Sequence, residues 1–431
     1  MSQIVRRGWA TLLSVLLLLS CAACGQGQNG RTLTVGIYSG NYWGTPAGDS
    51  YQVIDNAIDR FEADYPGISV EYISGIGTDA YSEWLAQQIL MGKEPDVYFV
   101  LPEDFNLLVT SGALEALDGR MDSDVSFDQT AYYEACLQAG QSDGRQYALP
   151  YESVPTMMFV NKTILEENGI AVPDNDWTWD DFYRICAQVT DVENRQFGLY
   201  GYTWLNALYS NGASLFSEDG SACYLNDENI QESIRFVQRL EELNGGYTVT
   251  SRDFDLGRVA FRPFLFSEYR AYQPYPWRVK RYTGFEWECV SMPAGPNGEN
   301  ASELSTILLG VSSRSRNKDL AWEFVKLLSY SEETQKELYT SSHGISPLPA
   351  VAESADMLRQ LYESIPGSVD FGHEVMGEIM QTGVTTPKFD RYDQALTMAQ
   401  SVVTEILSGS ENPQTRLLTA QREINIFLGR S

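Results

Sequence analysis

The sequence predicts an α/β fold built on a parallel sheet, because patterns typical of strands and of helices alternate along residues 32–100. Short runs that alternate with period two or are continuously apolar indicate strands, and longer runs with apolar residues at helical spacing indicate helices. A strand–helix–strand order within one sheet needs crossover connections, which join parallel strands. With 431 residues, the chain is long enough for two or three domains.

Five elements are expected at the start of the chain, in the order strand, helix, strand, helix, strand. Glycine, alone or after proline, follows each helical run, as is common where helices end. The five elements are expected at Thr32–Tyr38, Tyr51–Tyr65, Ile68–Ile73, Tyr81–Met91 and Asp96–Val100.

The loops after the first and third strands are the first candidates for a binding site. In open parallel sheets, ligands lie outside the carboxyl ends of the strands. The first loop contains Ser39, Tyr42 and Trp43, and the second contains Glu103. Both loops therefore offer aromatic or hydrogen-bonding side chains at the edge where a ligand is expected.

The composition excludes several classes of function. The chain has 30 Lys and Arg against 58 Asp and Glu, a formal net charge of −28, so it has no basic field to attract nucleic-acid phosphates. Only two histidines are present, His343 and His373, which argues against a His-rich metal centre. No catalytic serine elbow, zinc-protease or P-loop motif occurs. We expect neither a metal nor another cofactor.

The first 24 residues have the plan of a secretory signal, with two arginines, an apolar run too short to span a bilayer, and small residues. Ala22-Ala23 before Cys24 resembles the lipobox of bacterial lipoproteins, in which that cysteine is acylated. Cys21 departs from the pattern, because lipoboxes usually have Leu there. The resemblance implies that Cys24 carries a lipid that tethers the chain to the cell membrane on its extracytoplasmic side. Residues 25–31 are expected to be a flexible linker.

Several motifs have a structural interpretation rather than a functional one. Thr178 and the acidic residue three positions later fit a capping box, so Trp179 and Phe182 are expected to pack in the core. Asn161 and Ser331 are expected to begin helices, because their side chains can accept hydrogen bonds from the first turn.

Beyond these local signals, the chain resembles the extracellular solute-binding proteins of carbohydrate ABC importers, the maltose-binding and multiple-sugar-binding group. The likeness extends from about Thr32 to Leu428, and short runs in a fixed order carry it. These runs are Glu94–Val97, Tyr147–Glu152, Met157–Lys162, Thr178–Phe182, Gly257–Phe261, Pro293–Gly298, Ala321–Lys326 and Gly344–Pro347.

The resemblance implies two α/β lobes of the periplasmic-binding-protein type, type II, with a ligand cleft at the hinge between them. The lobes are discontinuous, because the chain crosses between them more than once. Lobe one is expected to take 32–151 and 304–344, and lobe two 152–303 and 345–431. Glycine and proline near the crossings tolerate or fix unusual backbone angles, as hinges require.

A sugar ring presents an apolar face and an edge of hydroxyls, so its site needs flat aromatic and planar polar side chains. The implied fold gives such residues a place in both lobes and at the crossover. The expected ligand-binding residues are Ser39, Tyr42, Trp43 and Glu103 in lobe one, Tyr151 and Glu152 at the crossover, and Trp204, Tyr269, Phe389 and Tyr392 in lobe two.

The implied mechanism is capture of a small solute, a carbohydrate in the first instance, by closure of the lobes. A ligand that contacts both lobes stabilises the closed state, which then delivers it to the permease subunits and ATPase of an ABC transporter. No catalytic residue, nucleic acid or metal is part of this interpretation, and we expect a monomer.

Two alternatives remain open at this stage. The same fold could bind a polyamine, a metal complex, a phosphorylated compound or a peptide. An extracellular glycoside hydrolase is the rival class, but among 58 acidic residues some pair at hydrolase spacing is bound to occur, so such a pair carries no information.

Two smaller features are also open. Residues 122–128 place oxygens at alternate positions, as the start of a calcium loop does, but lack the glycine and glutamate that such a loop needs, which favours a solvated acidic loop. Cys136, Cys186, Cys223 and Cys289 are compatible with disulfides in an extracytoplasmic protein or with buried free thiols.

Overall fold

The chain folds around one nine-stranded sheet that runs through the molecule, as the computed structural model shows. The structure describes residues 31–43, 50–73, 75–271, 285–364, 373–386, 389, 391–409 and 413–429. The predicted signal, Cys24 as the predicted site of acylation, and most of the predicted linker lie outside the described residues. The strands are β1 (Arg31–Gly36), β2 (Ile68–Ile73), β3 (Val97–Val100), β6 (Ala148–Asn161), β7 (Phe197–Leu199), β8 (Val259–Leu265), β9 (Trp287–Val290), β10 (Ser302–Val311) and β11 (Gly383–Val384).

The beginning of the chain confirms the predicted order of elements. β1 pairs in parallel with both β2 and β3, and α2 (Ser50–Asp64) and α3 (Thr78–Met91) form the crossovers. β1 leaves the ladder two residues earlier than expected, so residues 37 and 38 already belong to the loop after it. α3 begins three residues earlier than expected, because Gly77 in extended conformation precedes its first turn.

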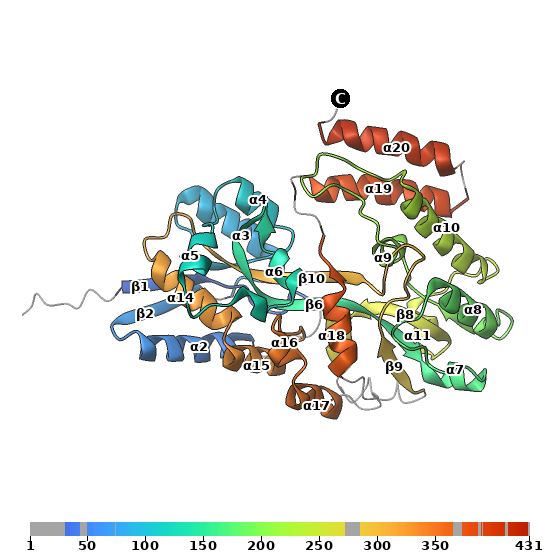
Figure 1. Ribbon diagram of the computed structural model, residues 1–431, viewed down its shortest axis with the longest axis horizontal. Helices are drawn as coiled ribbons and strands as arrows, with labels where there is room; N and C mark the ends of the chain where they lie inside the picture. The colour runs from blue at the N-terminus through green and yellow to red at the C-terminus, as the bar shows by residue number, and fades with distance from the viewer. Residues whose placement is uncertain are drawn as a thin grey trace, which may run out of the picture.

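Two long strands, β6 and β10, connect the halves of the molecule. β10 lies antiparallel to β3 through residues 308–311 and antiparallel to β6 through residues 304–310. Beyond Pro155, β6 pairs instead with β8 and β9. Figure 1 shows β6 and β10 passing through the middle, with α3 and α14 (Lys318–Ser329) on one side and α8 (Trp179–Val189) and α10 (Glu228–Glu242) on the other.

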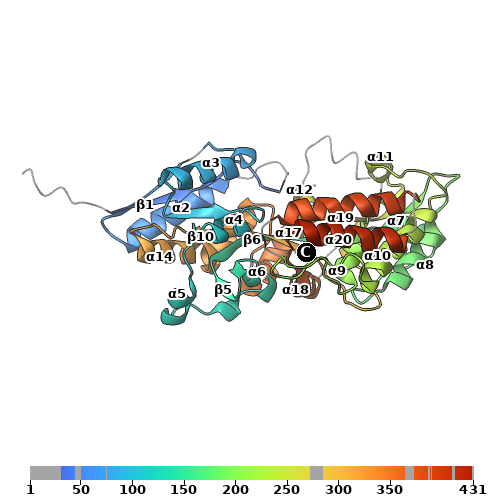
Figure 2. The same cartoon turned by 90° about the horizontal axis from the view of Figure 1, so that it is seen from above.

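Helices cover both halves of the sheet. Near the C-terminus, α19 (Tyr392–Leu407) and α20 (Pro413–Phe427) lie side by side in both views (Figures 1 and 2). The remaining helices are α4 (Phe105–Thr110), α5 (Asp118–Ser123), α6 (Glu134–Gln138), α7 (Lys162–Glu167), α9 (Trp204–Ser210), α11 (Ser251–Asp255), α12 (Phe266–Ala271), α15 (Glu332–Ser341), α16 (Pro349–Ala352), α17 (Ala355–Ser364) and α18 (His373–Gln381).

The buried side chains form two hydrophobic cores. The first is built on β1, β3 and β10 and also takes in buried side chains of α16–α18, such as Val351 and Met376. The second is built on α8, α10 and α19, with Phe182 and Val403 among its members. The first core also takes in residues of the predicted lobe two, such as Val259 and Phe264, so the cores do not mark the lobe boundary, and the division of the chain at 151, 303 and 344 stays a prediction.

Three helix starts that were predicted from local signals are confirmed. Thr178 and Asp181 form a capping box at α8, and Trp179 and Phe182 are buried as expected. Ser331 accepts a hydrogen bond from the first turn of α15, and Asn161 accepts one from that of α7.

The two smaller open features have structural answers. The four cysteines at positions 136, 186, 223 and 289 are buried free thiols. Asp124 of the acidic stretch accepts hydrogen bonds from Lys326 and from the indole of Trp322, so it stabilises the packing of α14.

Among the described residues, no group of three or more His, Cys, Asp and Glu is placed to hold a metal ion. None of the described helices is both long and apolar enough to cross a membrane.

Candidate functional site

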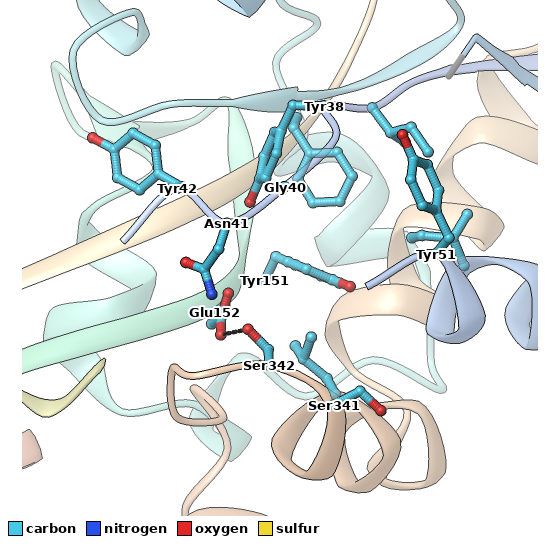
Figure 3. Close-up of a pocket in the computed structure, with 13 residues that line it drawn as sticks. Tyr38, Gly40, Asn41, Tyr42, Tyr51, Tyr151, Glu152, Ser341 and Ser342 are labelled. Atoms are coloured by element: carbon cyan, nitrogen blue, oxygen red, sulfur yellow. Dashed lines mark hydrogen bonds between the residues drawn. The ribbon is translucent and has the colours of Figure 1, made fainter. Parts of the chain in front are cut away.

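A pocket lies beyond the carboxyl ends of β1 and β3, at the edge of the sheet where the sequence predicted a ligand. The loop after β1, the start of α2, β6 and the end of α15 form its walls (Figure 3). It encloses about 490 Å³, counting the solvent at its mouth. Its polar and aromatic lining is Tyr38, Asn41, Tyr42, Tyr51, Tyr151, Glu152, Ser341 and Ser342.

A bulge in β6 explains how two consecutive residues line the same pocket. Successive side chains of a regular strand point to opposite faces of the sheet. Here Leu308 pairs with Pro150 and Ile307 pairs with Glu152, which leaves Tyr151 without an opposite residue. Such bulges bend a strand and re-aim its side chains next to functional sites. Tyr151 and Glu152 can therefore both face the pocket.

Tyrosines give the pocket its aromatic character. Tyr38 packs edge-on against Phe99, which in turn packs edge-on against Tyr151, with ring centroids 5.3 and 4.8 Å apart. Burial, and then the charge of Glu152, raise the pKa of Tyr38, so its phenol stays protonated. The Tyr42 hydroxyl donates to Glu103 Oε2 at 2.7 Å, and burial together with that carboxylate raises the pKa of Tyr42.

Glu152 is the carboxyl group at the inner end of the pocket, and it is only 3% exposed. Its Oε1 accepts hydrogen bonds from the Ser342 hydroxyl (Figure 3) and from the Gly344 amide, the latter at 2.6 Å. Burial raises the pKa of Glu152, while these two donors, the Trp43 indole and Arg270 act against the rise. The indole Nε1 itself has no partner at ordinary hydrogen-bond geometry.

Two further polar groups lie behind the pocket. Asn41 Nδ2 and His343 Nδ1 are 3.0 Å apart, which joins the loop after β1 to the chain after α15. Burial, and then Arg270, lower the pKa of His343 to about 4, so at neutral pH the ring is uncharged and Nδ1 can accept from Asn41. Arg270 is 6% exposed and donates to the Tyr339 carbonyl at 2.7 Å. Its guanidinium lies over the Tyr339 ring.

The structure brings together part of the predicted lobe-one site. Tyr42, Tyr151 and Glu152 line the pocket, and Glu103 joins it through Tyr42. Ser39 instead forms a backbone bridge to Gly77. Trp43 is 8% exposed and packs edge-on against Tyr42, so in this structure it supports the pocket from behind.

The four residues predicted for lobe two do not line this pocket. Trp204 is buried in the second core, and Tyr269 is 1% exposed and packs against Trp287. Phe389 and Tyr392 pack against each other at the start of α19.

Two observations nevertheless bring the start of α19 close to α4 and to the loop after β1. Asn106 Nδ2 donates to the Phe389 carbonyl at 3.0 Å. Asp393 is close enough to raise the pKa of Tyr42, although burial and Glu103 contribute more. The start of α19 therefore lies beside α4 and near Tyr42.

Sequence reasoning missed several lining residues. Tyr38 and Asn41 lie in or beside the loop it had selected, so the strand-end rule could have found them. Tyr51 entered the prediction only as the first residue of an expected helix. Ser341 is the last residue of the amphipathic helix α15 and Ser342 follows it, and no local signal marks either residue.

The sequence profile described as bacterial extracellular solute-binding protein matches residues 45–336, more than half of the chain. The chain belongs to this family.

The chain is also similar to individual proteins and solved structures. A galactooligosaccharide-binding protein of Bacillus subtilis is 22% identical over 348 residues, which cover 76% of this chain and 75% of the relative. An ABC substrate-binding protein from Listeria monocytogenes, solved with cycloalternan, aligns with a TM-score of 0.69 at 21% identity, covering 94% of this chain and all of that one. A cyclic α-maltosyl-1,6-maltose binding protein from Arthrobacter globiformis aligns with a TM-score of 0.76 at 19% identity, covering 93% and 99%.

These likenesses confirm the predicted fold class, a two-lobe α/β solute-binding fold. In this extracellular solute-binding protein, the pocket lies at the strand ends of the half that contains β1 and β3, beside the crossing strand β6.

Proposed function

We propose that this solute-binding protein captures an oligosaccharide between its lobes and delivers it to the permease of an ABC importer. Tyr42, Tyr151, Glu152 and Glu103 form the part of the site nearest the hinge, and Tyr392 with Phe389, which do not line the pocket in this structure, would reach the ligand when the lobes close. The proteins named by the comparisons bind galacto-oligosaccharides, cycloalternan and cyclic maltosyl-maltose, which supports a saccharide as ligand.

One observation carries the proposal most directly. The described lining of the pocket combines tyrosines with amide, hydroxyl and carboxylate groups, and no cationic side chain is among the described lining residues. Aromatic rings suit the apolar face of a sugar, and the polar groups suit its hydroxyls. A phosphorylated or acidic ligand would need a cation there, because phosphate and carboxylate recognition rests on charged donors.

The remaining parts of the proposal concern location and partners. A lipid on Cys24 would hold the protein at the outer face of the cell membrane, close to the permease subunits. The protein would act as a monomer and would perform no catalysis, since the site needs only to bind, close and release. The predicted lobe division and the ligand-binding residues belong to this proposal.

Thermal-shift binding tests the ligand class. Maltotriose, a cyclic glucan and a galacto-oligosaccharide are compared with glucose 6-phosphate, spermidine and a tripeptide. A ligand that binds only the folded state stabilises it by about 2.7 kcal/mol at a concentration of 100 Kd, which raises Tm by several degrees. A shift with a saccharide and intact sugar after incubation supports the proposal. Shifts only with the other compounds would refute the ligand class, and released product would indicate a hydrolase.

A matched pair of variants tests the site. Tyr42→Phe removes a hydroxyl that donates to a carboxylate at the pocket mouth, and Tyr72→Phe removes a hydroxyl that donates to Asp55 at 2.8 Å outside the pocket. Weaker sugar binding is expected only in the first variant. Equal binding in both would place the ligand elsewhere.

A further inference from the structure

The segment Ser342–Ile345, which follows α15, is tied to the crossing strand β6. The Ser153 amide donates to the Ile345 carbonyl at 3.0 Å, and the Ile345 amide donates back to Ser153 at 2.8 Å. This pair fixes one end of the segment at the place where β6 changes partners from β10 to β8. Movement of one half of the sheet relative to the other must pass through this region.

Glu152 holds the rest of the segment. Its Oε1 accepts from both the Ser342 hydroxyl and the Gly344 amide, and it is buried, so water cannot replace either donor. Both donors share this one carboxyl oxygen, and a buried donor left without an acceptor is destabilising. The position of the segment therefore depends on that of the Glu152 carboxylate.

The pocket wall is tied to the same segment from the other side. Asn41 lies next to His343 of the segment, and its Oδ1 accepts from the Trp43 amide at 2.7 Å. Three parts that are far apart in the chain thus meet here: the loop after β1 through Asn41, strand β6 through Glu152, and the segment through His343. Figure 3 shows Asn41 and Glu152.

The interior of the pocket is narrow. The space open to the centre of a water molecule is about 30 Å³. Since about 10–15 Å³ of such space holds one water, there is room for about two. A sugar ring is far larger, so its entry must displace lining side chains, and Ser341 and Ser342 are among those that border the space.

We propose that Glu152 and Asn41 are positioning residues that convert filling of the pocket into movement of segment 342–345, and so into lobe closure. This proposal rests on the proposed function and gives Glu152 a role other than the ligand contact that the sequence suggested. A ligand shifts the equilibrium between lobe positions only by its difference in affinity for them. Segment 342–345 supplies that difference, because a filled pocket and the resting segment compete for the same space.

The test measures lobe geometry with and without ligand. Dyes are placed on exposed Glu83→Cys of α3 and Arg422→Cys of α20, in the full chain with Cys21 and Cys24 replaced by Ser. Single-molecule energy transfer then reports the distance between the halves in the free protein and with maltotriose, the cyclic glucan or the galacto-oligosaccharide. Glu152→Ala is expected to shift or broaden the free-protein distribution and to weaken binding of whichever saccharide binds by at least about tenfold. Glu152→Gln, which keeps an oxygen for both donors, is expected to restore the wild-type distribution.

Gly310→Ala is the control for a merely structural role. A Cβ there would overlap Leu114 Cδ2, inside the sheet and away from the pocket lining. The Gly310→Ala variant is expected to have a lower Tm, with the distance distribution and the saccharide affinity unchanged. Any one of three results would overturn the proposal. The first is a wild-type distance distribution in Glu152→Ala, and the second is an equal change of that distribution in Gly310→Ala at the same loss of Tm. The third is a Glu152→Gln variant that does not recover the wild-type distance distribution. The distance distributions of the ligand-free proteins test the role of Glu152 without any ligand. Failure of every saccharide to bind would instead refute the proposed function.

Discussion

Replacement of Gly344 by alanine should destabilise the protein through one contact. A Cβ on Gly344 would lie 2.5 Å from Glu152 Cδ and closer still to its Cγ and Oε1. Real Cβ atoms do not approach other atoms this closely. Because Glu152 is buried, its side chain cannot move into solvent to make room.

The expected magnitude has two parts. Extra volume in a well-packed region costs about 1–3 kcal/mol. If the carboxylate moves away, the buried Gly344 amide loses its acceptor, which costs about 1–3 kcal/mol more. The total of about 2–6 kcal/mol corresponds to a fall in Tm of roughly 4–24 °C for a large domain.

Calorimetry of the variant, beside Gly119→Ala, measures this fall. Gly119 lies in α5, where an added Cβ would meet no atom within 4 Å and φ is not positive, so the same substitution there should leave Tm unchanged or slightly higher. The double variant Gly344→Ala, Glu152→Ala relieves the overlap, and its loss should be smaller than the sum of the single losses. A wild-type Tm in Gly344→Ala, or additive losses in the double variant, would refute the reasoning.

Three further predictions concern the pocket mouth and two carboxyl groups. Tyr42→Phe should weaken saccharide binding by about three- to tenfold, the effect of about 1 kcal/mol, while Tyr72→Phe leaves the affinity unchanged in calorimetric titration. Burial raises the pKa of Asp104 to about 6, so its ionised form is destabilising, and stability is lost as pH rises from about 4 to 6. Asp104→Asn should therefore exceed the wild-type Tm at pH 7 and match it near pH 4, and a constant difference would contradict this. Burial raises the pKa of Asp124, but hydrogen bonds from Lys326 and its neighbours outweigh burial and lower it. Asp124→Asn should therefore have a lower Tm than wild type at pH 7, and the deficit should begin to shrink as pH falls below about 4 and go on shrinking toward the lowered pKa, whereas an undiminished deficit at pH 3 would count against the ion pair.

Much of the fold was predictable because its signals are local. The alternation of apolar residues, the helical spacing in α2 and the capping box at Thr178 each depend on residues within a few positions of one another. The parallel order of β1, β2 and β3 follows from the crossovers between them. The general location of the pocket follows from the rule that ligands lie at strand ends.

The site itself was only partly predictable. Tyr42, Tyr151 and Glu152 were found because they lie at a strand end or at the crossover. Whether Trp204, Tyr269 and Phe389 contact a ligand could not be decided from sequence, since an aromatic side chain suits a core as well as a sugar. In the structure all three are buried.

The sequence by itself determined the α/β class, the first five elements, the helix starts and the acidic character that argues against nucleic-acid binding. Tertiary structure alone decided that a bulge turns Tyr151 and Glu152 to one pocket, and that Ser342 and Gly344, some 190 positions later, bond the Glu152 carboxylate. The physical reason is the range of the interactions. Backbone preferences and caps act over a few residues, whereas a buried carboxylate finds its donors only after packing has brought distant segments together.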